Sequence, residues 1–299
     1  AIGNAFWQHR LFLLHGDARY ADVLERIMYN GLISGVSLDG MTFFYQNPLE
    51  SDGKRVLYQG QTVRAPWFEV ACCPPNITRF LASMPGYVYG VRDDEIYVNL
   101  FLANTAEMEV HGTKIALRQE TRYPWDGTVR ISVDPAAPAA FTLNVRIPGW
   151  ARNEPVPSDL YRFIDRSAEA PALEVNGEPF PIALDKGYAR IRRTWAKGDA
   201  VEFELPMPVR RVIAHEKVAA DAGRVALQRG PLVYCAEGVD NGGRALDLAI
   251  PDAMALTPEF RPDLLDGVVA VEGKDFLAIP YYAWANRGPG EMAVWFPRR

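Results

Sequence analysis

Residues 72–101 read CCPPNITRFLASMPGYVYGVRDDEIYVNLF, and the spacing of their apolar residues changes from that of a helix to that of a strand. Asn76 can cap a helix over residues 77–84, and Pro85-Gly86 can end it. Beyond this point apolar residues alternate with polar ones, which is typical of strands. The sequence therefore predicts a chain that is mostly helical up to Gly86 and mostly β after it.

Two amphipathic helices are expected before this segment. The first continues to His15-Gly16, a good C-terminal stop. Asp17 can cap the second, whose apolar residues keep helical spacing until Asn30-Gly31 closes it. Short connections between such helices favour an antiparallel array, either a bundle or an α-barrel. Residues 41–48 then read as an extended segment rich in aromatic side chains.

Many short alternating runs follow, beginning with a hairpin around the turn Arg92-Asp93-Asp94. Asn176-Gly177 is a strong signal for a type I′ turn between two further strands. The expected strands lie at residues 87–91, 95–101, 106–110, 114–118, 127–133, 141–147, 172–175, 188–195, 200–205, 224–228, 232–235 and 292–296. Short strands at such regular spacing indicate a β-sandwich or jelly roll.

The composition excludes several classes of protein. Of the 299 residues, 48% are hydrophobic and 23% are charged, as in globular proteins. The formal charge of −5 argues against a nucleic-acid partner. No apolar run reaches the roughly 20 residues that span a bilayer, so no membrane partner is expected. Three cysteines make no disulfide framework, which favours the cytoplasm over the periplasm.

The adjacent pair Cys72-Cys73 is the first candidate for chemistry. A thiolate is a strong nucleophile and a soft metal ligand, and a helix N-terminus favours it over the thiol. Three other interpretations stay open: small buried hydrophobic residues, a strained vicinal disulfide, and ligation of a metal by both sulfurs. Zinc accepts thiolates at about 2.3 Å but needs more ligands than these two.

Four longer motifs occur in one order along the chain. They are Phe44-Tyr45-Gln46-Asn47-Pro48-Leu49-Glu50, Cys72-Cys73-Pro74-Pro75-Asn76, Ala226-Leu227-Gln228-Arg229-Gly230-Pro231-Leu232-Val233-Tyr234 and Pro280-Tyr281-Tyr282-Ala283-Trp284-Ala285-Asn286-Arg287-Gly288. Together they resemble glycoside hydrolase family 127 and its close relatives, the β-L-arabinofuranosidases. The resemblance covers essentially the whole chain.

The resemblance implies a multidomain α + β fold, with an (α/α)6 barrel followed by antiparallel, jelly-roll-like β-sandwich domains. Residues 1–88 would be the C-terminal portion of the catalytic barrel. Residues 89–215 would form a β-sandwich closed by a strand at 290–298, and residues 216–289 a second, smaller β domain. Because the first residues already read as the inside of a helix, we expect the chain to be the C-terminal part of a longer polypeptide.

The resemblance also implies a Zn²⁺ site held by Cys72, Cys73 and a Glu and a Cys from an upstream Glu-x-Cys motif. Cys72 would be the nucleophile as well as a ligand, and Cys73 a ligand only. Tyr45 lies in the segment that supplies a sugar-contacting tyrosine. Trp67 could form a sugar platform or pack in the core. The general acid/base glutamate of the family lies upstream and is absent from this chain.

The remaining polar candidates have structural interpretations. The histidines match none of the family's pocket histidines and are expected at the surface or in ordinary packing. Glu50 and Glu69 are expected to be solvated or locally paired carboxylates, and Cys235 a buried thiol. These histidines are His9, His15, His111 and His215. Two arginines, Arg229 and Arg287, are expected to make structural hydrogen bonds.

The sequence thus predicts a zinc-dependent retaining glycoside hydrolase acting on β-L-arabinofuranosides through a cysteine nucleophile, and inactive as this isolated chain. The substrate would be an arabinofuranoside oligosaccharide or glycoconjugate, and a homodimer is also considered. The alternative is a non-catalytic carbohydrate-binding or scaffolding β-sandwich protein with a structural metal site. The ligands of the metal and their distance from an open pocket distinguish the two.

Overall fold

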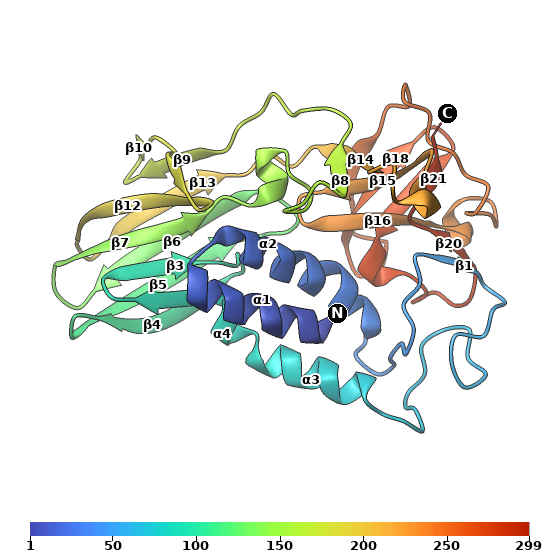
Figure 1. The fold of residues 1–299 in the computed structure, drawn as a ribbon, viewed down its shortest axis with the longest axis horizontal. Coiled ribbons are helices and arrows are strands. Elements are labelled where there is room, and N and C mark those ends of the chain that lie inside the picture. Colours follow the sequence, from blue (N-terminus) through green and yellow to red (C-terminus); the bar gives the residue numbers. More distant parts are fainter. Residues whose placement is uncertain (299) are drawn as a thin grey trace.

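The computed structural model describes residues 1–298 and combines a helical layer with three β-sheets (Figure 1). The helices are α1 (Ile2–His15), α2 (Ala18–Arg26), α3 (Cys73–Ser83) and α4 (Pro85–Val88), with the π-helix η1 (Ile27–Leu32) and the short 3-10 helices η2 (Ile33–Gly35), η3 (Gly149–Arg152), η4 (Ala219–Asp221), η5 (Gly238–Asp240) and η6 (Tyr281–Ala283). Within the described residues, no helix has the length and apolar character to cross a bilayer.

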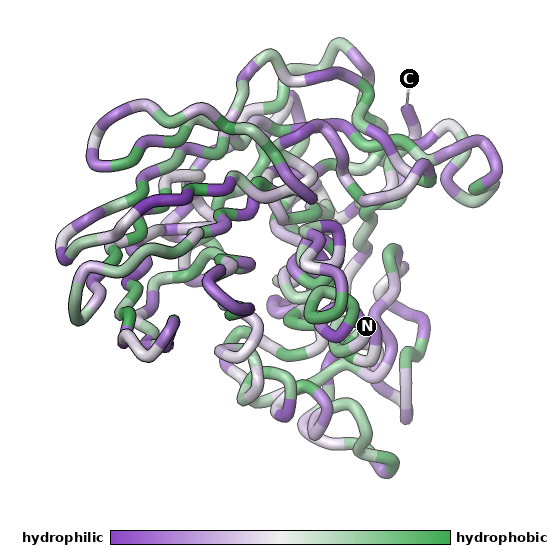
Figure 2. Tube along the Cα trace, turned by 60° about the vertical axis from the view of Figure 1, so that its left-hand side comes forward, coloured by the Kyte–Doolittle hydropathy of each residue, from purple (hydrophilic) through white to green (hydrophobic). Residues whose placement is uncertain are grey.

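The strands lie mostly beyond residue 86, as the sequence predicts. They are β1 (Glu50–Asp52), β2 (Tyr89–Arg92), β3 (Glu95–Val98), β4 (Asn104–Val110), β5 (Thr113–Thr121), β6 (Thr128–Pro135), β7 (Ala139–Arg146), β8 (Tyr161–Phe163), β9 (Ala172–Val175), β10 (Glu178–Pro179), β11 (Leu184–Asp185), β12 (Tyr188–Trp195), β13 (Asp199–Glu204), β14 (Val209–Ala214), β15 (Arg224–Arg229), β16 (Leu232–Glu237), β17 (Thr257–Arg261), β18 (Val268–Gly273), β19 (Phe276–Pro280), β20 (Glu291–Ala293) and β21 (Phe296–Pro297). Hydrophilic and hydrophobic residues alternate along several of them (Figure 2).

The end of α1 and the start of α2 lie where the sequence places them. Gly16 ends α1 in the left-handed region with φ of 60°, and the Asp17 side chain accepts a hydrogen bond from the Arg19 backbone at the start of α2. The expected stop at Asn30-Gly31 is wrong, because the chain continues through it as η1. Asn30 instead uses its side chain to bind the Pro231 carbonyl oxygen at 2.9 Å. The Asn30 side chain therefore makes a tertiary contact with Pro231 and does not end the helix.

The helix α3 begins earlier than the sequence predicts. Cys72 is its N-cap residue, and the two prolines lie in its first turn. The first N–H groups of a helix have no intrahelical partner, so prolines there remove no hydrogen bond. Asn76 is therefore inside the helix, and its side chain donates back to the Cys72 carbonyl oxygen at 2.9 Å.

Two sheets form the β-sandwich. One has the order β10-β9-β13-β6-β5-β4 and the other β11-β12-β7-β3-β2. Their facing sides share a core in which Ile131, Leu143 and Trp195 are fully buried. The predicted turn at Asn176-Gly177 is confirmed, with φ of 56° and 79° between β9 and β10. One pair, β3 with β7, is parallel, so the sandwich is not antiparallel throughout.

The third sheet has the main order β17-β18-β19-β16-β15-β14-β8. The expectation that residues 290–298 close the 89–215 sandwich is wrong. β20 pairs with β1 and β16, and β21 pairs with β15, so this segment belongs to the third sheet. Apolar packing explains this placement. The ring of the buried Phe296 packs edge-on against that of Phe276 in the third sheet, with centroids 5.4 Å apart.

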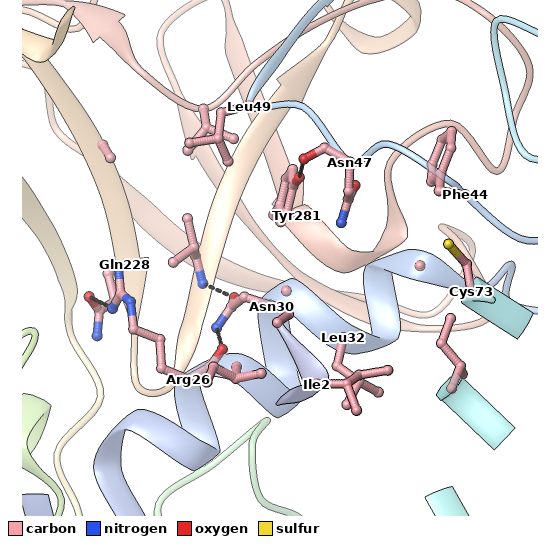
Figure 3. Close-up of a pocket in the computed structure, with 18 of the residues that line it drawn as sticks. Ile2, Arg26, Asn30, Leu32, Phe44, Asn47, Leu49, Cys73, Gln228 and Tyr281 are labelled. Carbon is pink, nitrogen blue, oxygen red and sulfur yellow. Dashed lines mark hydrogen bonds between the residues drawn. The ribbon is translucent and has the colours of Figure 1, made fainter. Parts of the chain in front are cut away.

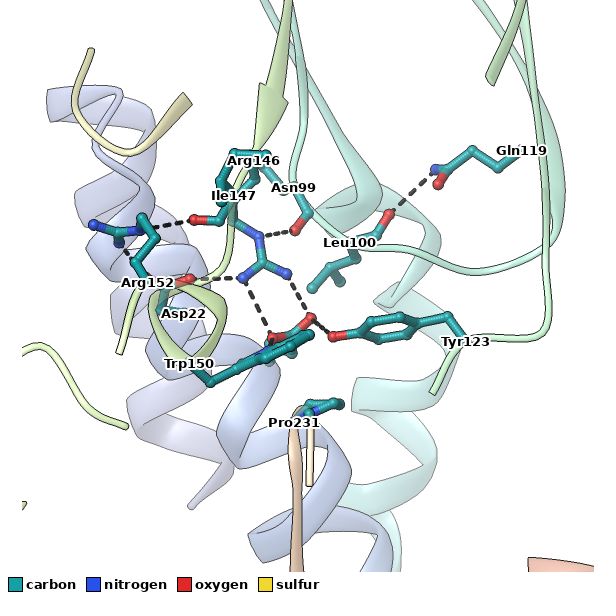
Figure 4. A network of polar contacts seen from close by, with 12 residues as sticks. Asp22, Asn99, Leu100, Gln119, Tyr123, Arg146, Ile147, Trp150, Arg152 and Pro231 are labelled. Atoms are coloured by element: carbon teal, nitrogen blue, oxygen red, sulfur yellow. Dashed lines mark hydrogen bonds and ion pairs between the residues drawn. The ribbon is translucent and has the colours of Figure 1, made fainter. Parts of the chain in front are cut away.

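A buried polar cluster joins the helical layer to the sandwich. Arg146 of β7, with no exposed side-chain surface, forms ion pairs with Asp22 and Glu25 of α2 (Figure 4). Tyr123 and Trp150 also donate to the Glu25 carboxylate, at 2.7 and 3.2 Å. Each buried charge thus has a partner, as burial requires. The (α/α)6 barrel itself stays a prediction, since the described helices form a layer.

Candidate functional site

The cysteine pair lies at the N-terminus of α3. The two Sγ atoms are 3.8 Å apart and both thiols are free, so the vicinal disulfide that the sequence left open is not formed. Cys72 is exposed, whereas Cys73 is partly buried. The pair is therefore accessible to a ligand, which excludes the interpretation as two small core residues.

Burial, followed by the hydrogen bond with Cys72, raises the pKa of Cys73 to about 11. Burial and the neighbouring sulfur thus favour the thiol form of Cys73. A bound cation would reverse this, because a coordinating thiol loses its proton.

The separation of the two sulfurs suits one metal. Two thiolates of a tetrahedral zinc site, each about 2.3 Å from the ion, lie about 3.8 Å apart, and the Sγ atoms are 3.8 Å apart before any metal binds. Among residues 1–298, however, no group of three or more His, Cys, Asp or Glu side chains could hold a metal. The pair supplies half of a tetrahedral site.

A cavity of about 880 Å³ opens beside the pair (Figure 3). Its walls come from α1, η1, the segment after η2, α3 and the third sheet, and Cys73 and Tyr45 both line it. The lining residues are Ala1, Ile2, Gly3, Arg26, Ile27, Asn30, Gly31, Leu32, Gly35, Phe44, Tyr45, Asn47, Leu49, Cys73, Asn76, Ile77, Arg79, Tyr161, Val212, Ala226, Leu227, Gln228, Val233, Tyr281, Val294 and Trp295. None of these is a carboxylate or a histidine, so the described lining supplies no carboxylic acid to protonate a leaving group.

Tyr45 is held in an aromatic cluster. Its ring stacks on Tyr58 with centroids 3.8 Å apart and an interplanar angle of 7°. Phe68 meets both rings edge-on, at 5.8 and 5.4 Å. Tyr45 nevertheless keeps 39% of its surface exposed. Part of its surface is thus available to a ligand in the cavity, while stacking on Tyr58 fixes the plane of its ring.

The structure separates the other sequence candidates from the cavity. Trp67 is 61% exposed and does not line it, so it neither packs in the core nor forms a wall of this site. Cys72 also lies outside the lining, next to Cys73 at its rim. Glu69 exchanges hydrogen bonds with Gln59, and Glu50 pairs with Arg224 at 3.4 Å. The locally paired interpretation is confirmed for both glutamates.

The remaining candidates take structural places. His9 packs edge-on against Tyr87 at 4.5 Å, and His15 packs on Tyr20. Cys235 is fully buried. Arg229 donates to the Trp125 carbonyl oxygen at 3.1 Å, and Arg287 pairs with two carboxylates. All of these agree with the sequence-based interpretation.

Four wall and support residues escaped the sequence analysis. They are Asn30, Asn47, Arg64 and Trp284, which connect the cavity wall to the third sheet. Asn47 and Trp284 did stand in two of the motifs, but nothing in either motif pointed to a partner more than 200 residues away. Only the fold brings them together.

Three family models match successive parts of the chain. The GH127 β-L-arabinofuranosidase catalytic domain matches residues 1–86, the GH127 middle domain residues 95–207, and the family 127 C-terminal domain residues 209–297.

Individual relatives agree. The chain is 34% identical to a non-reducing end β-L-arabinofuranosidase of Bifidobacterium longum subsp. longum, covering 100% of the chain and 48% of that protein. A solved GH127 β-arabinofuranosidase is 47% identical with a TM-score of 0.94, over 100% of this chain and 48% of the other. A GH127 β-L-arabinofuranosidase from Geobacillus stearothermophilus T6 is 42% identical with a TM-score of 0.87, over 100% and 49%.

The chain thus spans about half the length of the relatives it matches. Over that span the family models follow one another with short gaps and the fold is shared. The sequence matches and the shared fold agree with the four motifs, and the chain belongs to glycoside hydrolase family 127.

Proposed function

We propose that the natural polypeptide containing this chain is a retaining glycoside hydrolase that acts on β-L-arabinofuranosides, with Cys72 as its nucleophile. One observation carries the proposal. An accessible pair of free thiols stands at a helix N-terminus, at the rim of a cavity that Tyr45 also lines. The names of the relatives point to the same sugar linkage.

The proposal includes a zinc ion bound by Cys72 and Cys73. The sulfur separation of 3.8 Å supports it, because the pair fits one edge of a tetrahedral site. When bound, the metal supplies the positive charge that keeps both sulfurs anionic near neutral pH. The further ligands would come from outside residues 1–298. Ala1 lines the same cavity as Cys73, which places the start of α1 close to the site.

The reaction then needs two displacements at the anomeric carbon. The Cys72 sulfur donates an electron pair to C1 while the C1–O bond breaks, and the leaving oxygen takes a proton from a carboxylic acid. The resulting carboxylate next removes a proton from water, whose oxygen attacks C1 and releases the Cys72 thiolate. Retention follows because C1 is inverted twice. Tyr45 would orient the sugar through its exposed surface.

The acid/base group is proposed to lie outside this chain. The described cavity lining contains no carboxylate, and Glu50 and Glu69 have other partners.

The test compares two cysteine variants of the natural polypeptide. Cys72→Ser should abolish release of a chromogenic aglycone from a β-L-arabinofuranoside, because a serine hydroxyl is a far weaker nucleophile and metal ligand. Cys235→Ser is the matched control, since that thiol is buried away from the cavity, and it should keep the activity of its folded fraction. Activity retained in Cys72→Ser would exclude the proposed role.

A further inference from the structure

The motif at residues 280–288 has no part in the proposed chemistry, yet it lies behind the cavity wall. It follows β19, and its 3-10 helix η6 leads directly into Trp284, whose side chain is 2% exposed. A buried indole requires a partner for its N–H group. The identity of that partner connects the third sheet with the site.

Trp284 contacts the segment that carries Tyr45 on both sides of that residue. Its ring stacks on Phe44 with centroids 4.7 Å apart and an interplanar angle of 12°. Its Nε1 donates to Asn47 Oδ1 at 3.0 Å. From the same motif, the Tyr281 hydroxyl donates to the Pro48 carbonyl oxygen at 2.8 Å. Tyr45 itself is not touched, but the residues around it in sequence are fixed.

Arg64 completes this support. It is 6% exposed, its guanidinium lies 4.3 Å from the Phe44 ring centroid, and it donates to the Trp284 carbonyl oxygen at 2.6 Å and the Ser34 carbonyl oxygen at 2.8 Å. No carboxylate lies within ion-pair distance of it among the described residues. A buried cation that binds backbone carbonyls from two separate segments acts as a cross-link between them.

The support reaches the helical layer as well. Asn47 donates to the Ser34 hydroxyl, which in turn donates to the Asn30 carbonyl oxygen of η1. Asn30 receives a hydrogen bond from the Val233 backbone of β16 at 2.7 Å. A continuous set of buried and partly buried hydrogen bonds therefore runs from the third sheet through the cavity wall and back to that sheet. The Nε atom of Arg64 has no partner among the described residues, so the geometry of the segment rests on the bonds named here and on the Phe44 stack.

We propose that Trp284 is a positioning residue of the site: through Phe44 and Asn47 it holds the segment 44–48 so that Tyr45 faces the cavity beside Cys73. The inference rests on the proposed function for its catalytic consequence, but the geometric claim stands separately. It gives the third sheet a role in substrate binding although the sheet supplies neither cysteine.

The decisive variant is Trp284→Phe in the natural polypeptide. Phenylalanine can keep the stack on Phe44, but it leaves Asn47 Oδ1 without its donor in a half-buried place. We expect KM for a chromogenic β-L-arabinofuranoside to rise about tenfold while kcat changes less, since binding is lost and the nucleophile is untouched. Asn47→Ala removes the acceptor of the same bond and should give the same pattern.

Trp195→Phe is the matched control. Trp195 is equally buried, stacks on Phe141 at 5.6 Å and donates Nε1 to the Phe141 carbonyl oxygen at 3.2 Å, but it lies in the sandwich core. It loses the same kind of bond and should keep the wild-type KM. A tenfold rise of KM in this control would show general loosening and overturn the inference, as would an unchanged KM in an active Trp284→Phe protein.

Amide hydrogen exchange over residues 42–48 gives a second readout that needs no activity. Phe43 and Phe44 donate their backbone N–H groups to Ala65 and Gly35 at 2.8 and 2.9 Å, so the segment is protected. Exchange there should accelerate in Trp284→Phe and not in Trp195→Phe. If the wild-type protein hydrolyses no arabinofuranoside, the proposed function fails and this exchange alone decides the positioning claim: faster exchange supports it, unchanged exchange overturns it.

Discussion

At the scale of single residues, Asn30 and Arg146 show what a local pattern can and cannot predict. Asn30-Gly31 is a common helix stop, yet Asn30 binds Pro231 and Val233, about 200 positions away. Arg146 sits in an ordinary alternating run, and its two carboxylate partners lie on α2. By contrast, Gly16 and Asp17 were placed correctly, because a helix cap depends only on its neighbours in sequence.

The Arg146 cluster yields a stability prediction. Glu25→Gln leaves Arg146 with one carboxylate in a fully buried place, so it should lower the free energy of unfolding by about 3–5 kcal/mol. Glu202→Gln, which breaks the exposed pair with Arg130, should cost at most about 1 kcal/mol. Urea denaturation followed by circular dichroism measures both. Equal losses of unfolding free energy in the two variants would show that the buried Arg146–Glu25 pair contributes no more to stability than the exposed pair, and would contradict the prediction.

At the scale of elements, the docking of α2 on the sandwich depends on one close contact. Gly187 stands in the turn between β11 and β12 with φ of 83°, and a Cβ atom there would lie 2.6 Å from the Ala18 Cβ. The Ala18 backbone N–H also donates to the Lys186 carbonyl oxygen at 2.9 Å. The first turn of α2 thus sits directly on this hairpin, a contact that no periodic pattern reveals.

Two glycine variants separate this contact from backbone strain. Gly198→Ala, at φ of 92° with nothing within 4 Å, should cost only the strain of about 1–2 kcal/mol. Gly187→Ala adds overpacking against Ala18 and should cost about 1–3 kcal/mol more. Thermal unfolding of the two variants side by side measures the difference. If the Gly187→Ala protein were as stable as the Gly198→Ala protein, α2 could move away from the hairpin without loss of stability, which would contradict this prediction.

The packing of α1 against α4 predicts a pH dependence. Burial, with Arg10 as a second cause, lowers the pKa of His9, which packs against Tyr87. The unfolded chain therefore binds this proton at a higher pH than the folded one, and stability is lost as pH falls through 6.5 towards the folded pKa. His9→Phe keeps an aromatic ring and should flatten the change of unfolding midpoint between about pH 7.5 and 5.5. An unchanged slope would contradict this assignment.

At the scale of the whole molecule, sequence reasoning found the order of helical and β parts but not the assembly of the sheets. Residues 292–296 are apolar like many buried strands, and the packing of Phe296 on Phe276 places them in the third sheet. The cysteine pair was identified from its adjacency, whereas the cavity beside it needs walls from the helical layer and the third sheet together. The division into domains at residues 88 and 215 stays a prediction.

Residues 1–299 alone are expected to lack activity. Two thiols without further ligands make a weak metal site, and the described cavity lining holds no carboxylic acid. This polypeptide by itself should therefore release no aglycone from a β-L-arabinofuranoside above the rate without protein, and should bind zinc more weakly than the natural polypeptide containing it. A chromogenic assay and zinc titration at equal protein concentration check this. Turnover by residues 1–299 would refute the proposed location of the acid.

The most direct measurement is to trap the sugar on the protein. The natural polypeptide is mixed with an arabinofuranoside whose leaving group departs rapidly, quenched in acid within milliseconds, digested and mapped by mass spectrometry. The account predicts one pentosyl group on the sulfur of Cys72, absent from the Cys72→Ser variant. A pentosyl group on a carboxylate, or on Cys73 with Cys72 unmodified, would contradict it.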